Sequence, residues 1–148
     1  RHSVAGVALT PGFRNDGADD STRESNVSQK TDQEVKQILE KKGHYALSWE
    51  DLDKVELPTG VVSSMYRVGD PTSPAAPTVF KVYYPPDCTI EAHTHDCDYT
   101  EIILEGSQRV GATWHAAGDI RIGLANRGYG PLVAGPEGAW VLFVFASN

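Results

Sequence analysis

The chain has 148 residues, of which 40% are hydrophobic and 22% charged, a composition typical of one globular domain. Its net charge of -7 argues against a nucleic-acid partner, and no run approaches the roughly 20 apolar residues of a membrane helix. Cys88 and Cys97 are too few for a disulfide framework, and Arg1 is not followed by a secretory signal pattern. We therefore expect a cytoplasmic protein with a small-molecule partner and no membrane.

Residues 1–57 are predicted to form an N-terminal arm with one or two short helices. Residues 3–9 have the composition of a strand, which in a β-barrel protein is able to pair with the sheet edge of a neighbouring subunit. Residues 11–32 are rich in Gly, Asp, Ser and Asn, which predicts a loop without core residues. An arm of this kind favours a homodimer.

One amphipathic helix is predicted after this loop. Thr31 is a good N-cap, Val35 and Ile38 follow at helical spacing, and Gly43 is a stop signal. Residues 48–51 resemble a weaker capping box and predict a single helical turn.

Residues 58–148 are predicted to form an all-β barrel domain. Short runs rich in β-branched and aromatic residues recur between Gly, Pro and Asp, at the close spacing typical of an antiparallel sandwich or barrel. These runs are residues 61–68, 78–84, 99–106, 107–114, 119–125, 130–135 and 139–145.

His93 and His95 are the first candidates for chemistry. They flank one residue in an extended run, and the period of two in a strand places both imidazoles on the same face. Continuing by twos brings Tyr99 and Glu101 to that face, unless the turn signal at residues 96–98 breaks the strand. Two His and one carboxylate with open positions suit non-haem iron, and zinc, manganese or nickel are also tolerated.

The stretch from Asp87 to Gly106 resembles the first motif of the cupin family, G-x5-H-x-H-x3-4-E-x6-G. Both histidines and Gly106 are in register. Asp87 replaces the opening Gly, and Tyr99 occupies the position of the metal-binding Glu, with Glu101 two residues further on.

The second cupin motif, G-x5-P-x-G-x2-H-x3-N, aligns with residues 118–133 without a gap. Gly118 matches this motif. Four other motif positions differ, because Leu124, Asn126, Tyr129 and Val133 replace Pro, Gly, His and Asn.

The resemblance covers roughly residues 60–146 and implies a double-stranded β-helix, or jelly-roll, barrel. It also implies a site for one divalent ion, with Fe(II) or Zn favoured over Mn or Ni. The implied ligands are His93, His95 and either Tyr99 or Glu101, with Glu101 and Tyr129 available for acid-base catalysis. The implied activity is that of a metal-dependent enzyme acting on a small organic molecule, either a dioxygenase or a lyase, isomerase or cyclase.

Alternative interpretations stay open for several residues. Tyr99 and Tyr129 also suit simple packing, and Arg121, which interrupts an apolar alternation, suits exposure to solvent or binding of an anionic substrate, of which solvent is favoured. His115 is predicted to lie in a turn, and Cys97 in a loop without function. Because two standard ligands are replaced, a non-catalytic ligand-binding or sensor cupin is the alternative function.

Overall fold

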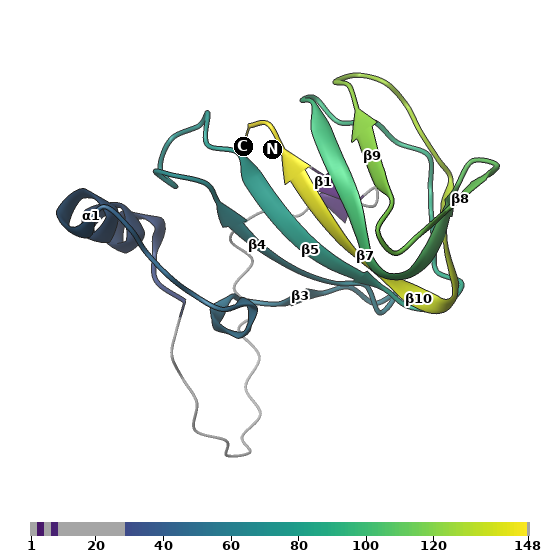
Figure 1. The fold of residues 1–148 in the computed structure, drawn as a ribbon, viewed down its shortest axis with the longest axis horizontal. Helices are drawn as coiled ribbons and strands as arrows, with labels where there is room; N and C mark the ends of the chain where they lie inside the picture. Colours follow the sequence, from purple (N-terminus) through teal and green to yellow (C-terminus); the bar gives the residue numbers. More distant parts are fainter. Residues whose placement is uncertain (1–2, 5–6, 9–28, 148) are drawn as a thin grey trace, which may run out of the picture.

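The computed structural model describes residues 3–4, 7–8 and 29–147 (Figure 1). The strands β1 (Ser3–Val4) and β2 (Val7–Ala8) pair with each other in antiparallel fashion. The predicted single strand over residues 3–9 is therefore a pair of shorter strands. Of the loop predicted over residues 11–32, residues 11–28 lie outside the described residues, residues 29–31 have no regular structure, and Asp32 already belongs to the first helix. Within the described part of the chain, no helix has the length and apolar character needed to cross a membrane.

The helix α1 (Asp32–Lys42) begins and ends where the sequence predicts. The Thr31 hydroxyl accepts from the backbone N–H of Glu34, whose carboxylate accepts from the N–H of Thr31, so both groups of a capping box are satisfied. Gly43 closes the helix in the left-handed conformation at φ 79°. The predicted turn after it is the short 3-10 helix η1 (Trp49–Asp51), in which the N–H of Ser48 donates to Asp51.

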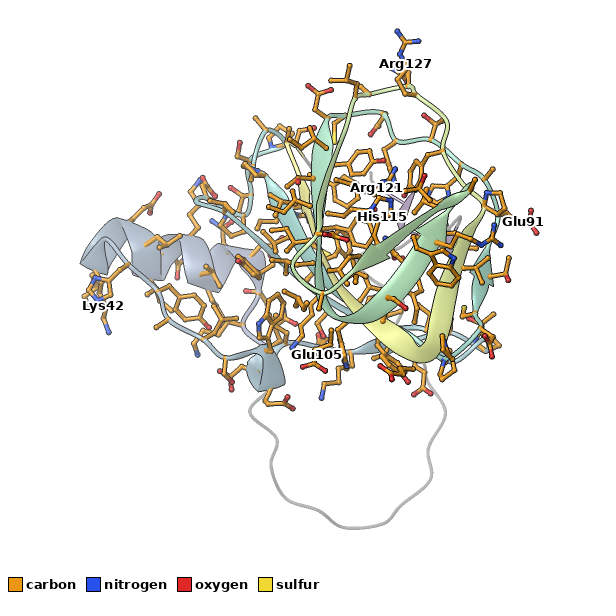
Figure 2. The ribbon with its side chains drawn as sticks, turned by 45° about the vertical axis from the view of Figure 1, so that its right-hand side comes forward. Lys42, Glu91, Glu105, His115, Arg121 and Arg127 are labelled. Atoms are coloured by element: carbon orange, nitrogen blue, oxygen red, sulfur yellow. The ribbon has the colours of Figure 1, made fainter. Side chains whose placement is uncertain are left out.

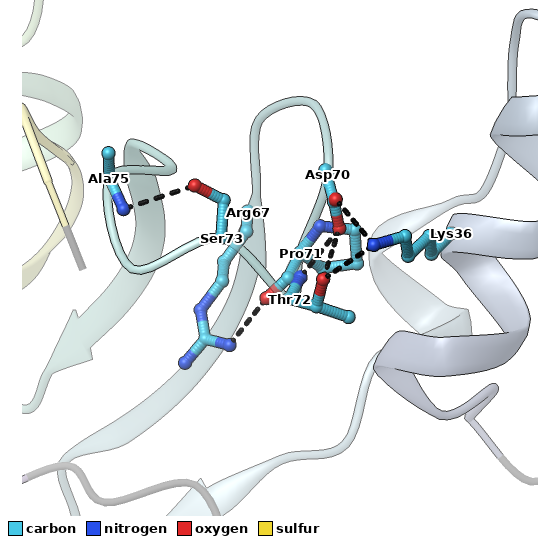
Figure 3. Close-up of polar contacts among 7 residues, drawn as sticks. All are labelled: Lys36, Arg67, Asp70, Pro71, Thr72, Ser73 and Ala75. Atoms are coloured by element: carbon cyan, nitrogen blue, oxygen red, sulfur yellow. Dashed lines mark hydrogen bonds and ion pairs between the residues drawn. The ribbon is translucent and has the colours of Figure 1, made fainter.

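Ion pairs attach α1 to the loop that follows β4 (Val62–Arg67) (Figure 3). The ammonium of Lys36 lies 3.1 Å from a carboxylate oxygen of Asp70 and 3.4 Å from the hydroxyl of Thr72. Arg67 donates to the carboxylate of Asp32 and to the carbonyl of Pro71, both at 2.9 Å. The helix is thus held beside the β-sheet by charged groups, since it contributes no buried residue to the core.

The rest of the chain forms one antiparallel, jelly-roll sheet, which confirms the all-β prediction. Its strand order is β3-β4-β5-β10-β7-β8, with β6 paired to β10 and β9 to β7. No pairing among the described strands joins β3 to β8, so the sheet is folded over but not closed (Figure 1). The remaining bounds are β3 (Val55–Glu56), β5 (Thr78–Tyr84), β6 (Thr89–Ile90), β7 (Tyr99–Val110), β8 (Thr113–Ala116), β9 (Ile120–Gly123) and β10 (Leu132–Phe145).

Two long strands, β7 and β10, run through both layers of the fold. The first half of β7 pairs with β9 and its second half with β8, while β10 pairs with β7 along most of its length. The bend falls at Gly106, whose φ is 73° and where a side chain would collide with the carbonyl of Gly138. Each long strand covers two of the shorter predicted runs. The strand continues through the bend, although the register between β7 and β10 shifts between Ala134 and Ala139.

The core lies between the two layers, on the inward face of the strands. Residues of β5 and β10 supply most of it, and six of them are completely buried: Val82, Tyr84, Ala134, Val141, Phe143 and Phe145. One strand departs from this pattern. On β9 the apolar side chains Ile120 and Ile122 are 62% and 83% exposed, whereas Arg121 points inward.

Candidate functional site

His93 and His95 lie between β6 and β7, next to the apolar core. His93 forms an isolated antiparallel bridge with Tyr129, in which each backbone N–H donates to the other residue's carbonyl at 3.0 Å. The two imidazole centroids are 5.0 Å apart, so the structure brings the two rings together as the spacing predicts. The extended run is broken by a bend at residues 96–97, and the two histidines are not part of a regular strand.

The phenol hydroxyl of Tyr129 lies between the two imidazoles. Its oxygen is 3.0 Å from Nε2 of His93 and 3.1 Å from Nε2 of His95. The bridge between residues 93 and 129 fixes this arrangement, because it places the two backbones side by side. Tyr129, which the second cupin motif aligns with its His, therefore contacts both histidines.

The direction of these hydrogen bonds follows from the third partner. Nδ1 of His93 lies 2.8 Å from the carbonyl oxygen of Glu91, which can only accept, so Nδ1 carries the proton. In the neutral ring Nε2 of His93 then accepts from Tyr129. The Tyr129 oxygen in turn accepts from Nε2 of His95, and one chain of donors and acceptors joins the three side chains.

Tyr99, at the start of β7, forms the wall of the site beside His95. Its ring centroid is 4.8 Å from that of His95 and 5.7 Å from that of Tyr129, and the residue is 5% exposed. Gly123 of β9 faces this ring, and any side chain there would overlap it. The close packing of two strands therefore depends on a glycine at this position.

Burial raises the pKa of both phenols. Desolvation is the main cause for Tyr99, opposed by the positive charge of Arg121 and by hydrogen bonds with Tyr129 and Arg121. Desolvation likewise raises the pKa of Tyr129 far above its usual range, assisted by the negative charge of Glu101. Both hydroxyls are protonated at neutral pH and are able to donate.

Glu101 and Arg121 form an ion pair inside the fold. They lie opposite each other on β7 and β9, and NH1 of Arg121 donates to Oε1 of Glu101, which is completely buried. The prediction that favoured solvent for Arg121 is wrong. Period-two alternation separates two faces without saying which is inside, and here the polar face of β9 is the inner one because the buried carboxylate needs a partner.

Gln108 and His115 belong to the same interior, and the sequence did not single them out as site residues. The amide of Gln108 donates to Oε1 of Glu101 at 3.0 Å, and Gln108 is completely buried. His115 lies in β8 opposite Gln108, not in the predicted turn, and is half-buried. Figure 2 labels both His115 and Arg121 over the folded sheet. The bend in β7, visible only in three dimensions, brings these residues together.

His93, His95 and Tyr129 provide the donor atoms that a metal ion could use. Among the residues that the structure describes, no three His, Cys, Asp or Glu side chains are grouped to hold one. Oxygen from Tyr129 completes a different set with His93 and His95. Ligand atoms about 2.0–2.1 Å from a tetrahedral zinc ion lie roughly 3.3–3.4 Å from each other. The two distances from the Tyr129 oxygen, 3.0 and 3.1 Å, are hydrogen-bond distances slightly below that range, so a small outward shift of the three donor atoms would make room for an ion.

The other predicted residues have different surroundings. Glu101 directs Oε1 toward Arg121 and Gln108, and none of the described side chains donates to its Oε2. The pKa of this carboxyl is raised by burial, against the lowering effect of Arg121, His115 and His93. Cys88 and Cys97 are not joined by a disulfide.

Comparison with solved structures identifies the fold. The chain is similar to an RmlC-like cupin from Shewanella frigidimarina, at 16% identity and a TM-score of 0.60, over 71% of this chain and 91% of the other. It is also similar to KdgF from Halomonas sp., at 14% identity and a TM-score of 0.54, over 71% and 96% of the two chains. A third is oxalate decarboxylase from Bacillus subtilis, at 16% identity and a TM-score of 0.56, over 91% of this chain.

The chain therefore has the cupin fold. It spans 38% of the length of the oxalate decarboxylase chain. No protein-family model matches the sequence, and no curated protein matches it.

Proposed function

We propose that this cupin chain is a metal-dependent enzyme acting on a small organic molecule, with one divalent ion held by His93, His95 and Tyr129. The observation that carries the proposal is the position of the Tyr129 hydroxyl, within 3.1 Å of Nε2 of both histidines. Imidazole nitrogen and phenolate oxygen are ligands that suit Fe(II) or Zn, whereas Mg and Ca favour sites made of oxygen ligands alone. Mn and Ni are the less favoured ions.

When bound, such an ion would supply a Lewis acid for a substrate oxygen or, if it is iron, a centre for oxygen chemistry. The chain's own residues support the first. The carboxylate that would complete a two-His, one-carboxylate iron site is Glu101, and Arg121 and Gln108 occupy one of its oxygens. We therefore favour lyase, isomerase or cyclase chemistry over a dioxygenase.

Tyr99 is the proposed acid-base residue beside the ion. Its buried hydroxyl oxygen accepts from Arg121 and is hydrogen-bonded to Tyr129, and its raised pKa keeps it protonated, so it is able to deliver a proton to a substrate atom. Tyr99 also remains a candidate fourth ligand. Glu101 is assigned the role of anchoring Arg121 in place of the roles of ligand or base.

One observation favours a non-catalytic ligand-binding cupin as the second candidate. The hydrogen bonds from His95 through Tyr129 and His93 to the carbonyl of Glu91 form a complete chain without an ion. In that case the same side chains would bind a polar organic molecule directly. The purified protein would then contain this molecule and no metal ion.

The experiment is elemental analysis of the purified protein, together with the His93→Ala and His95→Ala variants. About one Fe or Zn per chain in the wild type, lost in both variants, is the expected result. His44→Ala is the matched control because His44 is exposed and lies in the segment between α1 and η1. Equal metal content in all four proteins would overturn the site, and no metal in any of them would favour the ligand-binding alternative.

We further propose that the chain forms a homodimer through the outer face of β9. Ile120 and Ile122 of β9 are 62% and 83% exposed, and Leu124, just after the strand, is 59% exposed. The three form an apolar row along a strand that pairs on one side only within the described sheet. Exposed apolar strand edges promote pairing with another chain. In a two-fold symmetric dimer both subunits contribute the same surface, so the apolar row of one subunit would pack against that of the other. Dimerisation would bury all three side chains.

A further inference from the structure

Arg121 enters the site from β9 and is held in place on two sides. NH1 donates to Oε1 of Glu101, and the guanidinium carbon lies 4.9 Å from the centroid of the Tyr129 ring. A guanidinium at this distance over a phenol is attracted by the face of the ring. The side chain therefore lies directly beside the residue whose hydroxyl meets both histidines.

The anchor of Arg121 is itself fixed. Gln108, from the second half of β7, donates to the same carboxylate oxygen that accepts from Arg121. Both Glu101 and Gln108 are completely buried, whereas the side chain of Arg121 is 21% exposed. Separating the two members of a buried ion pair leaves an uncompensated buried charge, which favours a position of the guanidinium within hydrogen-bonding distance of Glu101. The pair thus sets the orientation of the guanidinium plane.

The exposed part of Arg121 retains hydrogen-bonding capacity. A guanidinium has five N–H donors in a planar fork, and the Glu101 and Tyr99 side chains take up only part of them. The planar fork matches the two oxygens of a carboxylate, which a lysine ammonium does not. The free edge of Arg121 is therefore suited to a carboxylate group next to Tyr129.

The charge of the site selects among anions. Arg121 and Glu101 carry opposite charges and cancel each other. A divalent ion held by two neutral imidazoles and one phenolate would leave a single positive charge. This balance favours an organic monoanion over a neutral molecule or a dianion.

We infer that Arg121, oriented by Glu101 and Gln108, binds the carboxylate of the substrate, and that the substrates are small organic monocarboxylates. This inference rests on the proposed function, because it places the carboxylate beside the proposed metal site. Arg121 is thereby a substrate-binding residue, while Glu101 and Gln108 are positioning residues that act through it.

The test is calorimetric binding of matched probe pairs to the full chain, with and without one equivalent of Zn. The pairs are acetate with acetamide, glycolate with glycolamide, and benzoate with benzamide, which differ in charge but hardly in shape. We expect at least one carboxylate to bind about 10- to 100-fold more tightly than its amide, the range of a charge-assisted hydrogen-bonded pair. Arg121→Lys should remove most of this preference.

Matched variants separate recognition from folding. Arg127→Gln removes an exposed arginine that points away from the barrel (Figure 2) and should leave the preference intact. Because Arg121→Gln alone would leave Glu101 unpaired, the double variant Glu101→Gln/Arg121→Gln, which keeps the net charge, is the second test. Gln108→Leu should weaken carboxylate binding without changing zinc content, which a purely structural role would not do selectively.

The outcomes distinguish this inference from the proposed function. If zinc binds through His93 and His95 but carboxylates and amides bind alike or not at all, the inference is overturned and the metal site stands. If zinc does not bind, the proposed function fails, and the preference of the metal-free protein decides the inference. A preference that survives in both Arg121→Lys and the double variant would also overturn it.

Discussion

The hydroxyl oxygen of Tyr129 lies 3.0 Å from Nε2 of His93, although 36 residues separate the two in sequence. The backbone bridge between the same residues fixes this distance. The second contact of the hydroxyl, to His95, makes Tyr129 the centre of the site.

Tyr129→Phe should destabilise the metal-free protein. The change deletes the hydrogen bonds to both imidazoles and leaves their polar atoms in an apolar setting, which costs about 1–3 kcal/mol in the free energy of unfolding. Urea denaturation in the presence of a chelator measures it. Tyr66→Phe, on the outer face of β4, is the control and should cost far less; equal losses would contradict the chain of hydrogen bonds.

Gly123→Ala should disturb the site from the neighbouring strand. A methyl group at this position would overlap the ring of Tyr99, which has to move away from His95. We expect a loss of about 1–3 kcal/mol in stability and a changed near-ultraviolet circular dichroism signal from the tyrosines. Gly128→Ala adds the same methyl in ordinary contact distance of the His93 carbonyl and should leave both unchanged. Unchanged stability and an unchanged circular dichroism signal in Gly123→Ala would contradict the close packing of Gly123 against Tyr99.

The stability of the protein should carry a pH dependence from Glu101. Burial raises the pKa of this carboxyl in the folded state, so the folded protein binds its proton more tightly than the unfolded chain. The contribution of Glu101 is therefore most favourable below its ordinary pKa and is lost as pH rises through the raised one. In Glu101→Gln this part of the slope should disappear, as denaturation at several pH values will show.

The control for this slope is Glu105→Gln, because Glu105 is an exposed residue of the same strand. Its removal should leave the pH dependence of unfolding unchanged. A wild-type slope that also persists in Glu101→Gln would assign the dependence to another group.

Ile122→Arg should convert a dimer into a monomer. The substitution places a charge in the centre of the apolar row on β9, where a second copy would have to bury it. Light scattering after size exclusion gives the mass directly. Val55→Arg, at a 44% exposed position of β3, is the matched control and should remain dimeric. A monomeric wild type would contradict the assembly.

The local part of the fold and site could be predicted from the sequence. The helix after Thr31, the strand over residues 78–84 and the pair of histidines each depend on spacing within a short segment. The aligned motif also pointed to Tyr129. Such patterns are readable because capping groups and strand alternation act over only a few residues.

The interior polar residues could not be predicted in the same way. Alternation on β9 separates Arg121 from Ile120 and Ile122, but hydrophobicity assigns the apolar face to the core, and the opposite is found. Gln108 meets Glu101 only because β7 bends at Gly106 between them. These contacts depend on the path of the whole strand and on a buried charge that requires a partner.

The most direct test of the central claim is titration of the chelator-treated protein with Fe(III) under visible absorption spectroscopy. If Tyr129 is the third ligand, the wild type should develop a phenolate-to-iron charge-transfer band at one equivalent, with release of a proton. Tyr129→Phe should lack the band and Tyr66→Phe should retain it. A band of full intensity in Tyr129→Phe, or none in the wild type despite bound iron, would contradict the site of His93, His95 and Tyr129.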